Sequence, residues 1–377
     1  MWAVRFLPLA VAIILILTIS TPTVQSAPKS KIIAMTVDPN DKKNFKAEGC
    51  EIVHELIDAT ALDCPEDVSQ KHIKSGKAIR DEELSIVDMG ANTQIGAINV
   101  WADYTGAGVT VAVLDTGVDY NHIELSSSTC GDTAQPTFCG KSFVAYTTSI
   151  YDDNAHGTHV SGIITSDGVS DAQSRGAAPD ARVWMGKVCK ASGLCYTSNI
   201  AKAIEFVALN NVSKIMSISL GGGGTKYASC DKDYLAKKVN WAVTNYGITA
   251  VIAAGNSGGT VSSPGCASKA IAVGAVNNQD VRASWSGSGK ALDIVAPGVS
   301  IYSTLPANSY ASFSGTSMAT PHVAATIALM KQKSPSFTDS QIKNTLYGTA
   351  QDPGVAGWDN NYGWGRVDAY AAVNATP

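Results

Sequence analysis

Three polar residues have the types that nucleophilic catalysis requires: a carboxylic acid, an imidazole and a hydroxyl. Asp115 directly follows an apolar run, His156 precedes an apolar segment, and Ser317 precedes another. A serine hydroxyl is a weak nucleophile at neutral pH and needs a base to accept its proton. A neutral imidazole is such a base, and a buried carboxylate fixes its tautomer and stabilises the imidazolium that forms. The three types therefore indicate an acid, a base and a nucleophile.

Each of these residues also has an ordinary structural interpretation. Asp115 could be a turn residue, and Ser317 could be the N-cap of a helix. His156 and His159 could be buried polar groups or a pair of metal ligands. The combination favours catalysis, because one residue of each required type stands beside small residues at the boundary of an element.

Asn256 adds a fourth residue to this set. It lies in a glycine-rich turn directly after the apolar run 249–254. A side-chain amide at the end of a strand can donate to the negative oxygen that develops during acyl transfer. The positive end of a helix that begins at Ser317 favours the same charge. Asparagine is also common in turns, so its place relative to the other three residues is what favours a catalytic role.

Five apolar runs are expected to form the strands that position these residues. They are 109–114, 182–188, 214–220, 249–254 and 270–276. Runs that are apolar throughout indicate burial on both faces, which is typical of a parallel sheet covered by helices. Segments 198–210 and 233–245 have apolar residues at helical spacing. We predict a doubly wound α/β domain whose mostly parallel sheet is flanked by helices, with reactive groups at the carboxyl ends of strands.

The first 26 residues have the layout of a secretory signal peptide. Arg5 precedes the apolar run 6–19, and the small residues Val24 and Ser26 suit a cleavage before residue 27. A membrane anchor is the alternative, but a spanning helix needs about 20 apolar residues, more than this run contains. We expect a secreted, extracellular protein with no stable membrane anchor.

Charge and composition exclude nucleic acid as a partner. The net charge is −4, and the longest basic runs are the pairs Lys42-Lys43 and Lys237-Lys238. The sequence has no basic run long enough to bind along a phosphate backbone. We expect a monomer. Asn211 and Asn374 begin sequons for N-glycosylation.

Eight cysteines fit the oxidising compartment that export implies. Eight cysteines allow 105 connectivities, so the pairing of neighbours is a hypothesis from proximity. Free buried thiols are the alternative, and the paired motifs of a zinc site are absent from the sequence. The predicted pairs are Cys50 with Cys64, Cys130 with Cys139, Cys189 with Cys195, and Cys230 with Cys266.

Residues 27–88 differ from the rest of the chain and are rich in Lys, Asp and Glu. We predict strands at 31–37 and 51–62, a short helix at 66–74, and another short strand ending at Val87. These elements would form a small, separate α+β unit.

Six motifs resemble the subtilisin family, the subtilases, over about residues 94–373. They are Asp115-Thr-Gly-Val-Asp119, His156-Gly-Thr-His159-Val-Ser-Gly162, Ser219-Leu-Gly-Gly222, Ala253-Ala-Gly-Asn256, Ala296-Pro-Gly298 and Gly315-Thr-Ser-Met-Ala-Thr-Pro-His322-Val-Ala324. Their order, Asp then His then Ser, is that of subtilisin. The resemblance implies a serine endopeptidase with Asp115, His156 and Ser317 as triad. Asn256 and the Ser317 N–H would form the oxyanion hole, and His159 would be structural.

The resemblance also implies a substrate-binding site for protein or peptide substrates in extended conformation. Ser219, Leu220 and Gly221 match the strand edge that pairs with such a substrate, and they wall the first specificity pocket together with Ala253, Ala254 and Gly255. The residues that match the walls of this pocket are small and uncharged. We therefore expect substrates with an apolar or aromatic residue before the scissile bond.

Subtilases carry an N-terminal propeptide that assists folding and inhibits the enzyme until it is removed. The resemblance thus implies a signal peptide over 1–26, a propeptide that acts as the chain's own inhibitor over 27–88, and a peptidase domain over 89–377. Autocleavage is expected between Ile86 and Thr93.

The chain departs from the family pattern in two places. Ala325 replaces a usual glycine in the nucleophile motif, which tightens helix packing without affecting the chemistry. Segment 167–175 lacks the usual calcium-loop pattern, although Asp167 and Asp171 could ligate such a cation. We assign no calcium site and expect no catalytic cofactor.

Three rival functions fit less well. An esterase of the α/β-hydrolase type would have Gly-x-Ser-x-Gly and the order Ser, Asp, His, whereas here Ala319 replaces the second glycine and the order is reversed. A metal-dependent hydrolase would need a further ligand motif near His156. A non-catalytic secreted protein that retains the fold would not need all four catalytic positions filled.

Overall fold

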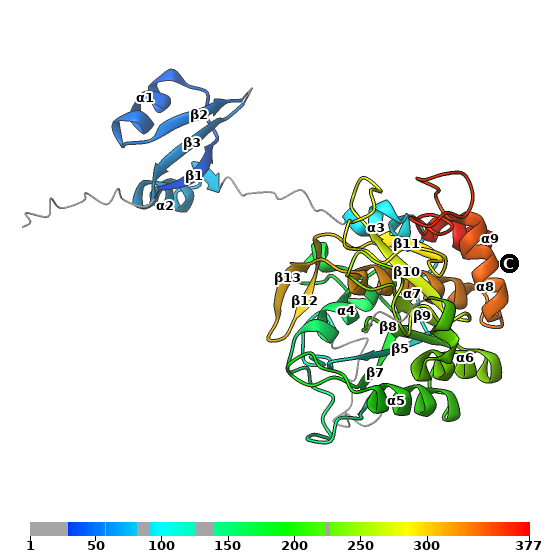
Figure 1. Ribbon diagram of the computed structural model, residues 1–377. Coiled ribbons are helices and arrows are strands. Elements are labelled where there is room, and N and C mark those ends of the chain that lie inside the picture. The colour runs from blue at the N-terminus through cyan, green and yellow to red at the C-terminus, as the bar shows by residue number, and fades with distance from the viewer. Residues whose placement is uncertain (1–28, 57, 81–89, 126–138, 223–226) are drawn as a thin grey trace, which may run out of the picture. The chain divides into compact units, whose positions relative to one another are not determined.

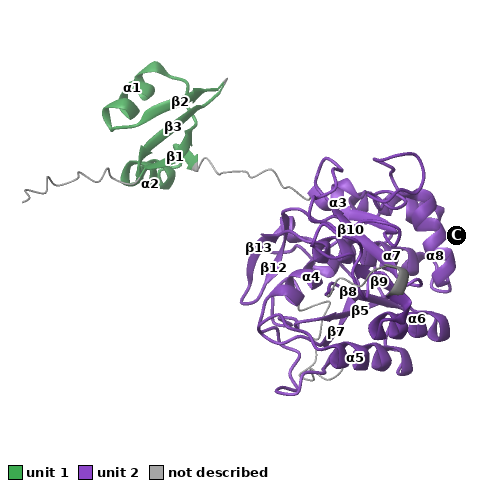
Figure 2. Cartoon of the chain, in the orientation of Figure 1, with its two compact units in different colours: residues 1–85 green, residues 86–377 purple. Residues whose placement is uncertain are grey.

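The computed structural model describes residues 29–56, 58–80, 90–125, 139–222 and 227–377. The chain divides into two compact units, residues 1–85 and 86–377, which Figure 2 colours separately. The predicted signal peptide lies outside the described residues. Within the described ranges, the chain has no helix that is both long and apolar enough to cross a membrane.

The first unit is an antiparallel sheet with two helices and is α+β, as predicted (Figure 1). The four strands follow the order β2-β3-β1-β4. The predicted helix at 66–74 is confirmed as α2. The elements are β1 (Lys29–Ala34), α1 (Pro39–Ala47), β2 (Glu51–Glu55), β3 (Thr60–Pro65), α2 (Glu66–Lys74) and β4 (Ala78–Arg80).

The predicted single strand over 51–62 is wrong, because the chain reverses within it. The Leu56 N–H donates to the Ala59 carbonyl oxygen at 3.0 Å, and β2 and β3 pair antiparallel on either side. The reversal contains neither glycine nor proline, the usual sequence signals of a turn. The further strand predicted to end at Val87 falls at residues 81–89, outside the described residues.

The second unit is built on a seven-stranded parallel sheet with the order β11-β10-β9-β8-β5-β7-β6. All five predicted strands are present, and the two edge strands, which are short, were not predicted. The strands are β5 (Thr110–Asp115), β6 (Gly140–Ser142), β7 (Arg182–Lys187), β8 (Ile215–Ile218), β9 (Thr249–Ala253), β10 (Ile271–Val276) and β11 (Ile294–Pro297). The predicted doubly wound α/β class is confirmed.

Helices cover both faces of this sheet. Along β5, Val111 and Val113 pack in the core that contains α4 and α7, whereas Ala112 and Leu114 pack in the core that contains α5 and α6. The predicted helices 198–210 and 233–245 correspond to α5 and α6, which lie side by side (Figure 1). The helices are α3 (Gly90–Gln94), α4 (His156–Thr165), α5 (Thr197–Leu209), α6 (Tyr234–Tyr246), α7 (Thr316–Lys333), α8 (Asp339–Thr349) and α9 (Ala369–Ala375), with 3₁₀ turns at Ala97–Asn99, Ala172–Ser174 and Tyr227–Lys232 and a hairpin of β12 (Ile301–Leu305) and β13 (Ser309–Phe313).

Three of the four predicted disulfides are present: Cys50–Cys64, Cys189–Cys195 and Cys230–Cys266. The first lies in the core of the first unit, where both sulfur-bearing residues are buried. Cys130 lies outside the described residues, and Cys139 has no disulfide partner within them. The fourth pair therefore stays a prediction.

Candidate active site

The end of β5 and the start of α4 bring the candidate acid and base together. Asp115 is fully buried, and its Oδ1 lies 2.7 Å from His156 Nδ1. The Thr116 N–H donates to the same carboxylate oxygen at 2.7 Å. A carboxylate in this place fixes the imidazole with Nε2 available for proton transfer.

Charge around His156 favours its protonated form. Burial alone would lower its pKa, but the charge and the hydrogen bond of Asp115 outweigh burial, and Asp152 adds to them. The net result is a pKa raised above the ordinary 6.5. The site thus stabilises the imidazolium that forms when this base accepts a proton.

Asp152 organises the start of α4, a role that the sequence did not reveal. The residue is almost fully buried, at 2% exposure. Its Oδ1 accepts from the N–H groups of Asn154 and Ala155, each at 3.0 Å. Its Oδ2 accepts from the N–H and the hydroxyl of Thr158, at 2.8 and 2.6 Å. This carboxylate therefore fixes the two residues before His156 and satisfies the Thr158 N–H, one of the N–H groups left free at the start of the helix that carries His156.

Ser317 lies in the first turn of α7, on the same cleft as His156. Its hydroxyl donates to the Ser219 carbonyl oxygen at 3.0 Å, and the Ser219 hydroxyl donates to the Ser317 carbonyl oxygen at 2.9 Å. Among the described contacts, no hydrogen bond joins Ser317 to His156. Such bonds are often long without substrate and tighten when it binds.

Asn256 is oriented by Thr316, a further residue that sequence reasoning missed. Its Oδ1 accepts from the Thr316 N–H at 2.9 Å and from the Thr316 hydroxyl at 3.0 Å. Because the oxygen is occupied, Nδ2 remains for the cleft. A Cβ placed on Gly315 would lie 3.3 Å from this Nδ2 and 3.6 Å from the Ser317 nitrogen. Two hydrogen-bond donors therefore converge beside the candidate nucleophile.

The predicted substrate-binding residues lie on this cleft, with one exception. Ser219, Leu220, Gly221 and Gly255 line it, whereas Ala254 is fully buried and does not. Ala253, which belongs to the same predicted wall, does line the cleft. Successive strand residues point to opposite faces, which puts the Ala254 side chain in the core beside α5 and α6.

One acidic residue, Asp233, also lines the cleft. Its Oδ1 caps α6 by accepting from the N–H groups of Leu235 and Ala236, at 3.0 and 3.2 Å. The same oxygen accepts from the Ser263 hydroxyl at 2.5 Å. Sequence reasoning placed this residue in a helix and assigned it no role in the cleft.

Two other histidines lie near the site, and both are held neutral by burial. Burial lowers the pKa of His159 to about 4 and that of His322 to about 4. His159 Nε2 lies 3.0 Å from the Ala311 carbonyl oxygen, and its ring stacks on Phe313 at 4.4 Å. His159 thus has the packing of a structural residue.

The loop 167–175 corresponds to the calcium-binding loop that the family resemblance suggested. It is arranged around the carboxylate of Glu124. Glu124 accepts from the N–H groups of Val169, Ser170 and Asp171 at 2.7–2.9 Å. A calcium site needs several oxygen atoms that point toward the ion. In this loop three backbone N–H groups point toward the Glu124 carboxylate instead. Among the described residues, no group of three acidic, histidine or cysteine side chains could hold a metal ion. The residues present therefore do not fit calcium at this loop.

Comparison with known proteins places the chain. The sequence model of the subtilase family matches residues 106–365. An alkaline protease of Alkalihalobacillus alcalophilus is 39% identical over 351 residues, which cover 89% of this chain and 86% of that protein. Subtilisin Savinase of Lederbergia lenta is 44% identical over 270 residues, 71% of this chain and 92% of that protein. Alkaline elastase YaB of a Bacillus species is 38% identical over 361 residues, 92% of this chain and 89% of that protein.

Proposed function

The chain belongs to the subtilase family and is a serine endopeptidase, and from this premise we propose that Asp115, His156 and Ser317 are its catalytic triad. The observation that carries the proposal is the 2.7 Å contact between Asp115 and His156 at the cleft that Ser317 also lines. Each of the three residues comes from a different element of the parallel sheet domain.

In this proposal the reaction proceeds through an acyl-enzyme. On substrate binding, Ser317 Oγ exchanges its hydrogen bond to the Ser219 carbonyl for one to His156 Nε2. His156 accepts the hydroxyl proton as Oγ attacks the scissile carbonyl, then donates a proton to the leaving amine. Asn256 Nδ2 and the Ser317 N–H stabilise the oxyanion. Water hydrolyses the ester by the same proton transfers in reverse, and none of these steps requires a cofactor.

We also propose that the protein is secreted as a monomeric precursor whose first unit is an inhibitory propeptide. We propose that autocleavage falls in the part of the expected range Ile86–Thr93 that precedes Gly90. Asn92 lies in α3 with 6% exposure, and its Nδ2 donates to the Arg175 carbonyl oxygen at 2.6 Å. A cut within α3 would break a packed element.

For the substrate we propose an extended peptide with an apolar or aromatic residue before the scissile bond. The walls formed by Leu220, Gly221 and Ala253 are small or apolar. Asp233 does not overturn this preference, because its carboxylate already accepts three hydrogen bonds from within the protein. A panel of peptides that differ only at this position tests it, and faster cleavage after Lys or Arg than after Phe or Leu would contradict it.

The decisive experiment is Ser317→Ala, expressed as the full precursor. Loss of the nucleophile should lower kcat by about 10⁶-fold, the loss known for the serine of subtilisin, and the precursor should stay uncut. Ser314→Ala is the matched control, because Ser314 lies three residues before Ser317 and, among the described contacts, its hydroxyl accepts from the Ser300 N–H rather than bonding a member of the triad. Normal processing and hydrolysis by the Ser317 variant would end the proposal. N-terminal sequencing of the mature wild-type protein locates the cut.

A further inference from the structure

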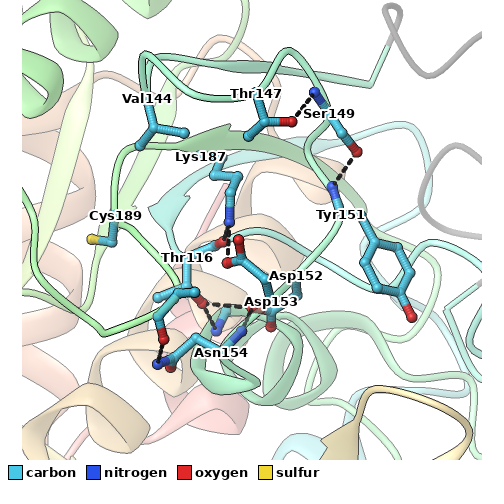
Figure 3. A network of polar contacts seen from close by, with 12 residues as sticks. Thr116, Val144, Thr147, Ser149, Tyr151, Asp152, Asp153, Asn154, Lys187 and Cys189 are labelled. Atoms are coloured by element: carbon cyan, nitrogen blue, oxygen red, sulfur yellow. Dashed lines mark hydrogen bonds and ion pairs between the residues drawn. The ribbon is translucent and has the colours of Figure 1, made fainter.

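Lys187 is completely buried although it carries an ammonium group. It ends β7, and its Cα pairs with the Asp115 Cα in the parallel ladder of β5 and β7. Its Nζ donates to the Thr116 carbonyl oxygen and forms an ion pair of 2.6 Å with Asp153 Oδ1 (Figure 3). Burial of an unpaired ammonium is strongly unfavourable, so these two acceptors are what make this lysine tolerable beside the active site.

Thr116 connects this ammonium to the catalytic residues, because each of its polar groups is bonded. Its N–H donates to Asp115 Oδ1 at 2.7 Å, and its carbonyl accepts from Lys187. Its hydroxyl donates to Asp152 Oδ1 at 2.9 Å and accepts from the Gly157 N–H at 2.9 Å. Lys187 therefore holds a residue that touches both the orienting carboxylate and the start of α4.

The other acceptor, Asp153, connects the pair to the cleft wall. Asp153 Oδ2 accepts from the Tyr146 hydroxyl at 2.9 Å, and that hydroxyl accepts from the Ala191 N–H at 3.2 Å. The Ala191 carbonyl accepts from Asn154 Nδ2 at 2.8 Å. Ala191 belongs to the loop that the disulfide Cys189–Cys195 closes, and this loop lines the cleft. Hydrogen bonds thus run from the wall to the triad.

We propose that Lys187 and Asp153 are a positioning pair that holds Asp115 and His156 in register with the disulfide-closed wall. A substrate seated on that wall then meets a base that is already aligned. This inference rests on the proposed peptidase function. Neither residue contacts substrate in it, and both act through Thr116 and the loop.

Substituting the pair should also change the pKa of His156 with a definite sign, because Asp153 lies three residues before His156 and Lys187 pairs with Asp115 in the ladder. Removing the ammonium removes a positive charge, so the pKa of His156 should rise. Removing the Asp153 carboxylate has the opposite effect, and removing both charges nearly cancels. The charges that act on His156 are those of Asp115 and Asp152, and His159 is a titratable neighbour whose pKa the charge of His156 lowers. The Asp153–Lys187 ion pair bonds Thr116, which in turn bonds both carboxylates.

The test compares Lys187→Met, Asp153→Asn and the double variant in the full chain. Peptide hydrolysis is measured against pH, and kcat is expressed per active site titrated with an irreversible serine-directed phosphonate. Lys187→Met should lower kcat per titrated site by about 10- to 100-fold, the size expected of a small misalignment, with KM little changed. The acid limb of kcat/KM should move to higher pH in Lys187→Met, to lower pH in Asp153→Asn, and back toward wild type in the double variant.

Lys343→Met is the matched control, because Lys343 makes the same two kinds of contact away from the cleft. Its Nζ bonds Asp339 Oδ2 at 2.8 Å and the Lys269 carbonyl oxygen at 2.6 Å. It should leave kcat and the acid limb unchanged.

Three outcomes would overturn the positioning role or the function beneath it. The Lys187 variant could have fewer titratable active sites and yet keep the wild-type kcat per site and the wild-type acid limb. That result would mean that Lys187 serves only the stability of the fold. If that variant does not fold, Asp153→Asn with an unmoved limb shows the same. Wild-type protein that neither hydrolyses peptides nor reacts with the phosphonate removes the proposed function, whereas active wild type with unresponsive variants removes this inference alone.

Discussion

The two halves of the cleft are held by different kinds of interaction. The half that carries Asp115 and His156 is braced by charges, namely the buried carboxylate of Asp152 and the ion pair of Lys187 with Asp153. The other half is held by neutral groups. Thr316 orients Asn256, and Ser219 holds Ser317, through hydroxyl and backbone contacts.

The difference teaches that pH and charge substitutions should act on one half only. Charges act over distance and change with protonation, so substitutions among them shift the pKa of His156. Neutral hydrogen bonds act only on the groups that they touch. Substitutions in the nucleophile half should therefore change the rate without moving the pH profile.

The largest effect in this comparison is expected for Asn256→Ala. Loss of one oxyanion donor should lower kcat by about 10²- to 10³-fold, because the donor acts in the transition state. KM and the acid limb of kcat/KM should stay as in wild type, and steady-state kinetics between pH 5 and pH 9 measure both. An acid limb that moved with Asn256 would show that the two halves are coupled.

The pH dependence of the wild type comes next. His156 must be neutral to act as a base, and its pKa is raised above 6.5, so activity should fall as pH drops through a value above 6.5. Two pH units below that pKa, the loss should be about 100-fold. The loss should reverse on return to neutral pH, and activity that persists unchanged at pH 5 would contradict the role of His156.

Folding should respond to acid separately from activity. His159 and His322 have pKa values of about 4 in the folded protein, below the ordinary 6.5. At these two residues the unfolded chain therefore binds more protons than the folded chain between those values, so their contribution lowers stability as pH drops from about 6.5 toward 4. Thermal melts across this range test it, and a Tm that rises toward pH 4 would be the opposite of the expectation.

Asp152→Asn tests the charged half with a moderate effect. The amide keeps one acceptor oxygen, so it cannot accept both from Thr158 and from the N–H groups of Asn154 and Ala155. The substitution also removes a charge that raises the pKa of His156. We expect kcat to fall about tenfold, as for a small misalignment of the base, and the acid limb to move to lower pH. An unmoved limb would show that this carboxylate acts through packing alone.

Thr316→Val tests the neutral half with a smaller effect. The variant loses the hydroxyl that donates to Asn256 Oδ1 and accepts from the Gly255 N–H, and it keeps the backbone hydrogen bond to Asn256 Oδ1. A single neutral hydrogen bond is worth about 1 kcal/mol, so kcat should fall about fivefold. The pH profile should superimpose on that of the wild type, and a shift would count against a purely neutral brace.

A chelator should have the smallest effect. The N–H groups of loop 167–175 point to Glu124 rather than leaving oxygen atoms for a cation. We expect EDTA to change neither activity nor Tm. A Tm that drops in chelator and recovers with added calcium would show that a cation stabilises the protein elsewhere.

Much of the fold was predictable from the sequence, because buried parallel strands are apolar throughout. All five such runs became strands. The short edge strands β6 and β11 were not predicted, because three or four residues are too few to show a hydrophobic pattern. The turn within 51–62 was not predicted, because it contains neither glycine nor proline.

The candidate site was predictable as far as each residue has a chemistry of its own. Asp115, His156, Asn256 and Ser317 stand at element boundaries and all four lie at one cleft or directly behind it. The bracing residues were not predictable. Lys187 ends an apolar strand, and its role comes from acceptors 34 and 71 residues away along the chain. A contact of this kind exists only once the fold has formed.

The burial of α7 has a consequence for how this protein loses activity with heat. Almost the whole helix is enclosed, and Val323, Ala324, Ile327 and Ala328 have no exposed surface. The helix opens only when the domain as a whole opens. Its backbone amides should therefore be among the last to exchange with deuterium, and Ser317, fixed to its first turn, should keep its reactivity until the same event. The rate at which Ser317 loses its reactivity toward a serine-directed label should therefore equal the rate of global unfolding.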